Sequence, residues 1–117
     1  MALPKKEKLK NHHIFNKLNS AKKVFSNKYF LLLGFTYNSI ENKNEFPQIV
    51  FIIKKKLLKS AVKRNKVKRR IEEAYRINRK SLNIKNYKYL IFFLTAEILD
   101  LDFQELNKFI LELNNYL

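Results

Sequence analysis

The apolar residues recur at helical spacing in three segments, which predicts three helices. The first covers residues 7–19. The second begins after Ser60, a residue that can cap a helix, and continues to about Lys80. The third opens at Asp100 or Asp102, whose carboxylates suit the positive end of a helix dipole. The side chains expected on the apolar stripes are Leu9, His13/Ile14 and Leu18, then Val67, Ile71, Ala74 and Tyr75, then Leu106, Phe109/Ile110 and Leu113.

Three other segments are short, apolar and rich in aromatic and β-branched residues, as is typical of strands. They cover residues 28–37, 47–53 and 87–95, and the polar residues 38–44 predict a loop between the first two. The order is α-β-β-(β)-α-β-α, with a further strand before the central helix left open. It predicts an α+β sandwich in which helices cover a central sheet. A chain of 117 residues is too short for two cores, so a single domain is expected.

Composition narrows the classes of function. The chain has 25 Lys and Arg against 10 Asp and Glu, a formal net charge of +15, and its 46% of hydrophobic residues argues against disorder. With no cysteine, disulfides, thiol catalysis and thiolate zinc sites are excluded. No apolar run approaches the roughly 20 residues that span a bilayer, and the N-terminal residues lack the apolar segment of a secretory signal. We therefore expect a cytoplasmic protein with no membrane partner.

The positive charge is concentrated in one part of the chain. Residues 54–70 contain ten basic side chains and no acidic one, whereas residues 97–117 contain five acids and a single Lys. Such a distribution favours a localised polyanion site, with nucleic acid as the first candidate and an anionic membrane surface as the second. The N-terminal lysines are less informative, because residues 1–8 suit either a phosphate-binding tail or a disordered one.

The predicted central helix carries this charge on the side away from its apolar stripe. On a helical wheel, Asn65, Lys68, Arg69, Glu72 and Arg76 fall on that side. Guanidinium, ammonium and carboxamide groups can together donate to several phosphate oxygens. The alternative is a solvated helix face, which usually intersperses Glu among the bases to avoid self-repulsion. The absence of acids before Glu72 therefore favours RNA or DNA binding.

The sequence Ala61-Val62-Lys63-Arg64-Asn65-Lys66-Val67-Lys68-Arg69, preceded by Lys55-Lys56, resembles the signature of the bacterial ribonuclease P protein component. The resemblance implies a sheet with a left-handed βαβ crossover. It also implies that an RNA subunit and its Mg²⁺ ions remove the 5′ leader of precursor tRNA, one protein serving each RNA subunit. The polypeptide would supply no catalytic residue, metal ligand or small-molecule site. The implied contacts to ribonuclease P RNA are Lys55, Lys56, Lys63, Arg64, Asn65, Lys66, Lys68 and Arg69.

Leader binding in this family uses aromatic residues of the first helix and first strand. Phe15 matches one of them, whereas Asn19 and Leu33 stand where aromatic residues are typical and cannot stack on bases. Tyr29 and Phe35 have the same strand parity as Leu33 and could substitute for it. The expected leader-binding residues are therefore Phe15, Tyr29, Leu33 and Phe35. Lys66, in place of a family arginine, keeps the charge but loses the planar fork.

Three other functions compete with this interpretation. A small ribosomal or general RNA-binding protein would not require Arg64 and Asn65 to follow one another in this order. A metal- or His-dependent nuclease would need a third partner for His12-His13, and none is identifiable. The acids Glu97, Asp100, Asp102 and Glu105 are explained by helix capping and a solvated turn. A peripheral membrane protein is disfavoured, because the apolar stripe of the basic helix is narrow and there is no Trp.

Overall fold

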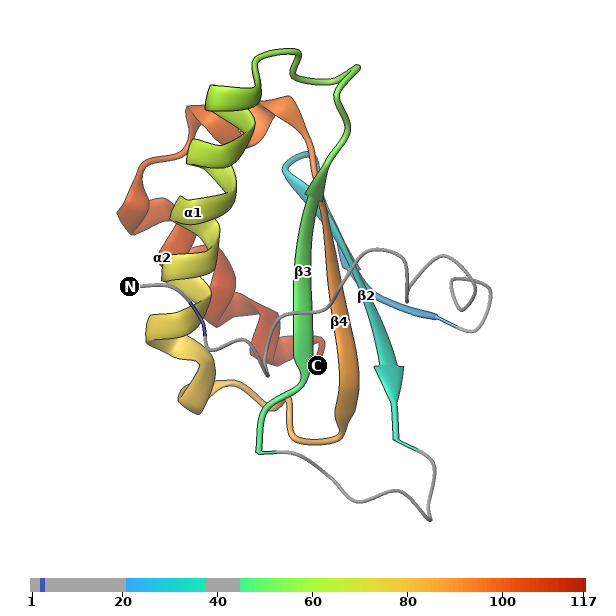
Figure 1. The fold of residues 1–117 in the computed structure, drawn as a ribbon. Coiled ribbons are helices and arrows are strands. Elements are labelled where there is room, and N and C mark those ends of the chain that lie inside the picture. Colours follow the sequence, from blue (N-terminus) through green and yellow to red (C-terminus); the bar gives the residue numbers. More distant parts are fainter. Residues whose placement is uncertain (1–2, 4–20, 38–44) are drawn as a thin grey trace.

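The computed structural model describes residue 3 and residues 21–37 and 45–117. The expected helix over 7–19, with Phe15, and the expected loop over 38–44 lie outside these residues. The described part forms four strands and two α-helices, with short 3₁₀ helices after them (Figure 1). The strands are β1 (Lys22–Ser26), β2 (Phe30–Thr36), β3 (Gln48–Ile53) and β4 (Tyr87–Leu94), the α-helices are α1 (Ala61–Asn78) and α2 (Phe103–Glu112), and the 3₁₀ helices are Arg79–Ser81, Ala96–Asp100 and Leu113–Asn115.

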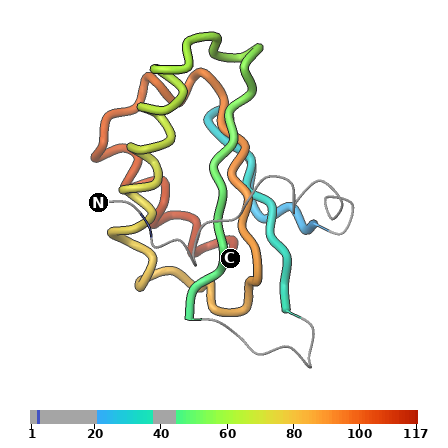
Figure 2. Tube along the Cα trace, viewed as in Figure 1, coloured from blue at the N-terminus to red at the C-terminus, as the bar shows by residue number. Residues whose placement is uncertain are grey.

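The sheet has the order β1-β2-β4-β3. The pairs β1–β2 and β2–β4 are antiparallel, whereas β3 and β4 are parallel and are joined through α1. In Figures 1 and 2, β3 lies in front of β4 and α1 lies to their left, so the path from β3 through α1 to β4 turns in the left-handed sense. This is the crossover that the resemblance implies, and it departs from the usual right-handed rule.

Both α-helices cover one face of the sheet, and the main core lies between them and the strands (Figure 1). Phe51 stacks on Phe92 with ring centroids 5.0 Å apart, and Phe30 and Tyr75 contact this pair from either side. The expected stripe of α1 is buried as predicted, at Val67, Ile71, Ala74 and Tyr75. Burying each large apolar side chain contributes about 1.5–3 kcal/mol, so this layer is the main source of the domain's stability.

Capping side chains explain where both α-helices begin. The Ser60 hydroxyl accepts a hydrogen bond from the backbone N–H of Lys63, 3.2 Å away, and so caps α1. Asp102 caps α2 in a capping box, in which its carboxylate accepts from the N–H of Glu105 and the Glu105 carboxylate accepts from the N–H of Asp102. The prediction of α2 from Asp102 is therefore confirmed, and of the acids in this segment Asp102 and Glu105 act as helix caps.

One strand has no counterpart among the three segments predicted as strands. β1 is short, lies at the edge of the sheet and begins with two lysines, and its register with β2 shifts between Lys23 and Phe25. Lysines and bulges are common on edge strands, where they discourage pairing with other chains. The same features remove the alternating apolar pattern that identifies a strand in sequence. The predicted order puts the further strand directly before the central helix, where the described residues form none, and the additional strand instead precedes the two predicted ones.

Candidate nucleic-acid interface

The acid-free basic segment forms the upper end of the molecule in Figure 1, where β3 leads into α1. Backbone N–H groups of Leu57 and Leu58 donate to the carbonyl of Lys54 at 3.0 and 3.3 Å, which folds residues 54–58 into a turn. Lys54, Lys55, Lys56 and Lys59 are all exposed on it. Residues 54–59, which we call the basic loop, therefore present four ammonium groups from a short, internally hydrogen-bonded stretch.

Arg64 holds this loop against α1. One guanidinium nitrogen, Nη1, donates to the carbonyl oxygens of Leu58 and Lys59, both at 2.8 Å. The planar group can reach both carbonyls because it projects backward from the first turn of the helix toward the preceding loop. Arg64 was predicted as an RNA contact, and its three remaining N–H donors are still compatible with that role. Its geometry gives it a structural role as well.

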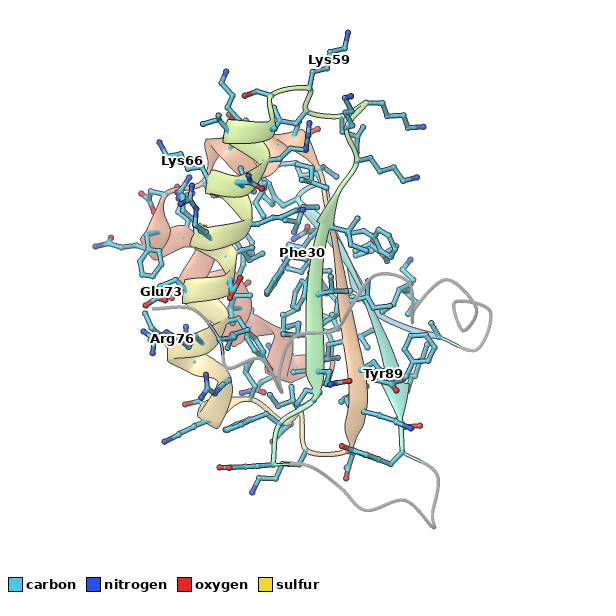
Figure 3. The ribbon with its side chains drawn as sticks, in the orientation of Figure 1. Phe30, Lys59, Lys66, Glu73, Arg76 and Tyr89 are labelled. Atoms are coloured by element: carbon cyan, nitrogen blue, oxygen red, sulfur yellow. The ribbon has the colours of Figure 1, made fainter. Side chains whose placement is uncertain are left out.

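The exposed side of the first half of α1 carries most of the predicted RNA-binding residues. Lys63, Asn65, Lys66 and Arg69 are exposed and Lys68 is half-buried, and Figure 3 shows Lys66 projecting away from the sheet. The structure thus brings the predicted set together, at Lys55, Lys56, Lys63, Arg64, Asn65, Lys66, Lys68 and Arg69.

Two further arginines of α1 have structural partners. Arg69 Nε donates to the carbonyl of Asn65 at 3.4 Å, a bond along its own helix. Arg70 points the other way, and its guanidinium donates to the carbonyl of Leu101, just before α2. Arg70 therefore links the two helices.

The basic surface ends where acids enter the helix. Glu73 and Arg76 form a bidentate ion pair, with Arg76 Nε 3.0 Å from one carboxylate oxygen and its Nη2 bonded to the other. The Arg76 hydrogen bond holds the pKa of Glu73 at about 2, well below its ordinary 4.5, and the same bond raises the pKa of Arg76. Arg76 is thus neutralised locally, which confines the uncompensated charge of α1 to its first half.

The face of the sheet opposite the helices is apolar and aromatic. Neighbouring strands place its side chains in three rows, because directly paired residues point to the same side. From the upper end downward the rows are Leu31–Phe93–Ile52, Leu33–Ile91–Val50 and Phe35–Tyr89–Gln48. Figure 3 shows Tyr89 on this side of the sheet and Phe30 between the sheet and the helices. We call this side of the sheet the outer face; Phe35 and Ile91 on it are buried, and Leu33, Val50, Ile52, Tyr89 and Phe93 are half-buried around them.

Leu33 and Phe35, both predicted to bind the leader, lie on the outer face, but Tyr29 does not. Its ring packs against Phe109 of α2, with centroids 5.4 Å apart, so it is on the helix side. The prediction that strand parity puts Tyr29 beside Leu33 is therefore wrong. The Asn27 side chain accepts from the N–H groups of Tyr29 and Phe30 at 2.8 and 3.0 Å. Because of this turn, the alternation of side chains along β2 starts at Phe30 and does not extend back to Tyr29.

A pocket of about 570 Å³ connects the outer face to the basic loop. Its apolar lining includes Leu31, Ile52 and Phe93 of the uppermost row, and Lys54 and Lys56 stand at its border. We call it the upper pocket. A cavity with apolar walls and ammonium groups beside it can accept an aromatic ring together with an attached phosphate.

Sequence reasoning missed several of these residues. Lys54 was counted only as charge, and Lys23 was not considered, although its register partner on β2 is Leu33. Ile52 and Phe93 belong to predicted strands, and their alternation with Phe51 and Phe92 was the available indication that they face away from the helices. Which strands are neighbours, however, cannot be read from that alternation.

Within the described ranges, no group of three or more His, Asp or Glu side chains is placed to hold a metal ion. The same part of the chain contains no helix long and apolar enough to cross a membrane.

The fold and this surface define a class: a small, basic α+β protein whose cationic helix and loop adjoin an apolar sheet face. The ribonuclease P family model matches residues 3–117. A ribonuclease P protein component from Rickettsia bellii is 36% identical over 114 residues, covering 92% of this chain and 93% of its own. Another from Prochlorococcus marinus is 33% identical over 91 residues, covering 71% and 70%.

Solved structures agree on the fold. The Staphylococcus aureus RNase P protein superposes with a TM-score of 0.70 at 18% identity, covering 94% of this chain and 96% of that one. The Thermotoga maritima RNase P protein gives 0.65 at 22% identity, covering 91% and 96%. The chain belongs to the ribonuclease P protein family. The relatives that it matches over most of their length are protein components of ribonuclease P.

Proposed function

We propose that this protein binds the catalytic RNA subunit of ribonuclease P through its basic loop and the first half of α1, and the 5′ leader of precursor tRNA through its outer face. The observation that carries the proposal is the continuity of the two surfaces at the upper pocket, where Lys54 and Lys56 adjoin Ile52 and Phe93. A single strand leaving a structured RNA would meet phosphate-binding groups first and an apolar, aromatic surface next.

The two surfaces suit different features of RNA. Ammonium and guanidinium groups neutralise phosphates, and this gives affinity that falls steeply with salt. A single-stranded leader also exposes its bases, which can pack on aromatic and apolar side chains without sequence preference. Tyr89 and Phe93 supply rings on this face, and Lys23 and Lys88 add charge to it. Leader binding would thus rest more on lysine charge and less on base stacking, since Leu33 has no ring.

The chemistry of leader removal is expected to belong to the RNA subunit and its Mg²⁺ ions, with one protein per RNA subunit and no catalytic group from the polypeptide. The protein's contribution would be electrostatic. Two RNAs that approach one another repel through their phosphates, and the cations at the upper end would offset that repulsion at the point where leader and RNA subunit meet. We expect this assembly in the cytoplasm.

Reconstitution tests the proposal. The purified protein is mixed with a bacterial ribonuclease P RNA at near-physiological Mg²⁺, and precursor-tRNA cleavage is measured with each component alone as a control. We expect cleavage to rise only when both are present. Cleavage by the protein alone would contradict the division of labour, and no stimulation would favour a ribosomal or general RNA-binding role.

Leader contact is tested by comparing precursors with short and long leaders. Phe93→Ala removes a ring from the outer face, and Phe109→Ala removes a similarly half-buried ring from the helix side. The gain in affinity from a long leader should shrink several-fold in Phe93→Ala and stay at the wild-type value in Phe109→Ala. Equal behaviour of the two variants would remove the leader from this face.

A further inference from the structure

A second pocket lies at the other end of the molecule, where α1 has ended and β4 begins. Its volume is about 740 Å³, and Lys22, Lys80 and Lys85 line it together with the amide side chains of Asn83 and Asn86. The three lysines come from three segments: β1, the 3₁₀ turn after α1 and the loop before β4. We call this cavity the lower pocket. Among the residues that the structure describes, it shares none with the upper pocket.

The backbone that carries Lys80, Asn83 and Lys85 is firmly held. The N–H of Ile84 donates to the carbonyl of Leu82 at 2.9 Å, and that of Tyr87 to the carbonyl of Ile84 at 3.0 Å. Asn114 then ties the loop to the C-terminal segment, accepting from the N–H of Asn83 at 2.8 Å and donating to the carbonyl of Ser81 at 2.6 Å. A preorganised wall of this kind reduces the entropy lost when a ligand binds.

An aromatic wall completes the pocket, and the only glycine of the chain makes room for it. Tyr87 lines the pocket and is itself 7% exposed. A Cβ atom at Gly34 would lie 2.6 Å from Cε1 and 2.7 Å from Cδ1 of the Tyr87 ring. Any other residue at position 34 would therefore displace that ring from its place against β2.

The side-chain charge of the lower pocket is one-sided, and Leu117, the last residue of the printed sequence, also lines it. Among the described residues that line it there are three lysines and no Asp or Glu. Lys80 follows the C-terminus of α1, and a cation there is explained in part by the helix dipole. That explanation does not reach Lys22 on β1 or Lys85 next to β4, which approach the same cavity from other elements. Converging ammonium and amide donors with no counter-charge among the lining side chains are suited to a phosphate group.

We propose that the lower pocket binds a phosphate of an RNA strand, as a second RNA contact separate from the upper surface. The inference rests on the proposed function, because it takes the partner to be the ribonuclease P RNA or its precursor tRNA. The 18 residues of α1 span about 27 Å, so the loop before α1 and the lower pocket beyond its end are separated by roughly the length of this helix. The protein would then hold two RNA segments at once and fix the distance between them.

Salt dependence tests this contact. Lys22→Gln, Lys80→Gln and Lys85→Gln are compared with Lys108→Gln, which removes the same charge from an exposed position of α2 outside both pockets. Binding is measured to ribonuclease P RNA alone and to the RNA with precursor tRNA, which identifies the strand concerned. For each lost phosphate contact the log–log slope against salt should fall by about 0.7–0.9. Lys108→Gln should leave it unchanged.

Cross-linking locates the contact independently. Because the chain has no cysteine, Asn83→Cys carries a photoreactive label at the lower pocket alone, with Gln104→Cys on exposed α2 as the control. We expect Asn83→Cys to cross-link RNA nucleotides that a label at Ala61→Cys does not reach.

Two outcomes would overturn the inference, and they can be told apart. If wild type binds and stimulates cleavage while the lower-pocket variants behave as Lys108→Gln and Asn83→Cys cross-links no more than Gln104→Cys, the lower pocket is not an RNA site and the proposed function stands. If wild type neither binds the RNA nor stimulates cleavage, both proposals fail.

Discussion

The two helices cover the same face of one sheet, yet their first turns have opposite electrostatics. α2 begins with Asp102 and Glu105 in a capping box, so negative charge meets the positive end of its dipole. The first turn of α1 contains Lys63 and Arg64 and no acid. The charge of α2 thus stabilises its own helix, whereas the charge of α1 opposes it. A helix that carries unfavourable charge at its start is better explained by a binding surface than by stability.

The largest effect should come from removing charge on α1. Lys63→Ala and Lys68→Ala together remove two of the predicted phosphate contacts. Each contact is worth roughly tenfold in affinity near 0.1 M salt, so ribonuclease P RNA should bind about 100-fold more weakly, with the salt slope lowered by about 1.4–1.8. Titrations at several salt concentrations measure both quantities. An unchanged slope would remove these lysines from the interface.

Arg64 should show a mixed effect, because it both carries charge and holds the basic loop. Arg64→Ala is expected to lower the free energy of unfolding by about 1.5–3 kcal/mol, the usual value of a hydrogen bond to a charged group, and to weaken RNA binding. Urea denaturation measures the first effect, and hydrogen exchange at the amides of Leu57 and Leu58 reports on the loop. Arg64→Lys keeps the charge without the planar fork. If the amide hydrogens of Leu57 and Leu58 exchange as slowly in Arg64→Lys as in wild type, the guanidinium group does not hold the loop.

Exchanging the first-turn charges should stabilise α1 and destabilise α2. Lys63→Glu would complete a capping box with Ser60, and should stabilise the protein by about 0.5–1 kcal/mol while weakening RNA binding. Glu105→Lys should destabilise it by about 1 kcal/mol and leave RNA binding as it is. Thermal denaturation and RNA titration of both variants check this. A loss of stability in Lys63→Glu would contradict the account of α1.

The smallest effect concerns the pair that ends the basic surface. Because the pKa of Glu73 is lowered from 4.5 to about 2 in the folded protein, its contribution to stability is complete above about pH 4.5 and is lost as the pH falls toward 2. The difference in melting temperature between wild type and Glu73→Gln should therefore shrink over that interval. A difference that stays constant from pH 5 to pH 2 would show that the ion pair does not contribute in solution.

Much of this architecture could be predicted from local patterns. The two α-helices have apolar stripes at helical spacing and capping residues, and the strands β3 and β4 are short apolar runs. All four lie close to where these patterns put them. β1 could not be found this way, because lysines and a bulge hide its alternation. Tyr29 was misplaced for a similar reason, since an Asn27 turn interrupts the strand period.

The predicted basic residues lie together because most of them follow one another on one helix and its loop. Two features could not be predicted from the sequence: the contact of Arg64 with the loop and the lower pocket itself. Both depend on groups brought together by the tertiary structure: backbone carbonyls in the first case, and lysines from three separate elements in the second.

The sheet order has a consequence for how the protein is made. β2 and β3 are consecutive in sequence but are not neighbours in the sheet, and each pairs with β4, which lies between them. A nascent chain that ends before Tyr87 cannot join them. At about 5–20 residues per second, the roughly 40 residues that follow β3 take about 2–8 s to be synthesised. The outer face and the upper pocket thus come into existence only after β4 has been synthesised and has entered the sheet.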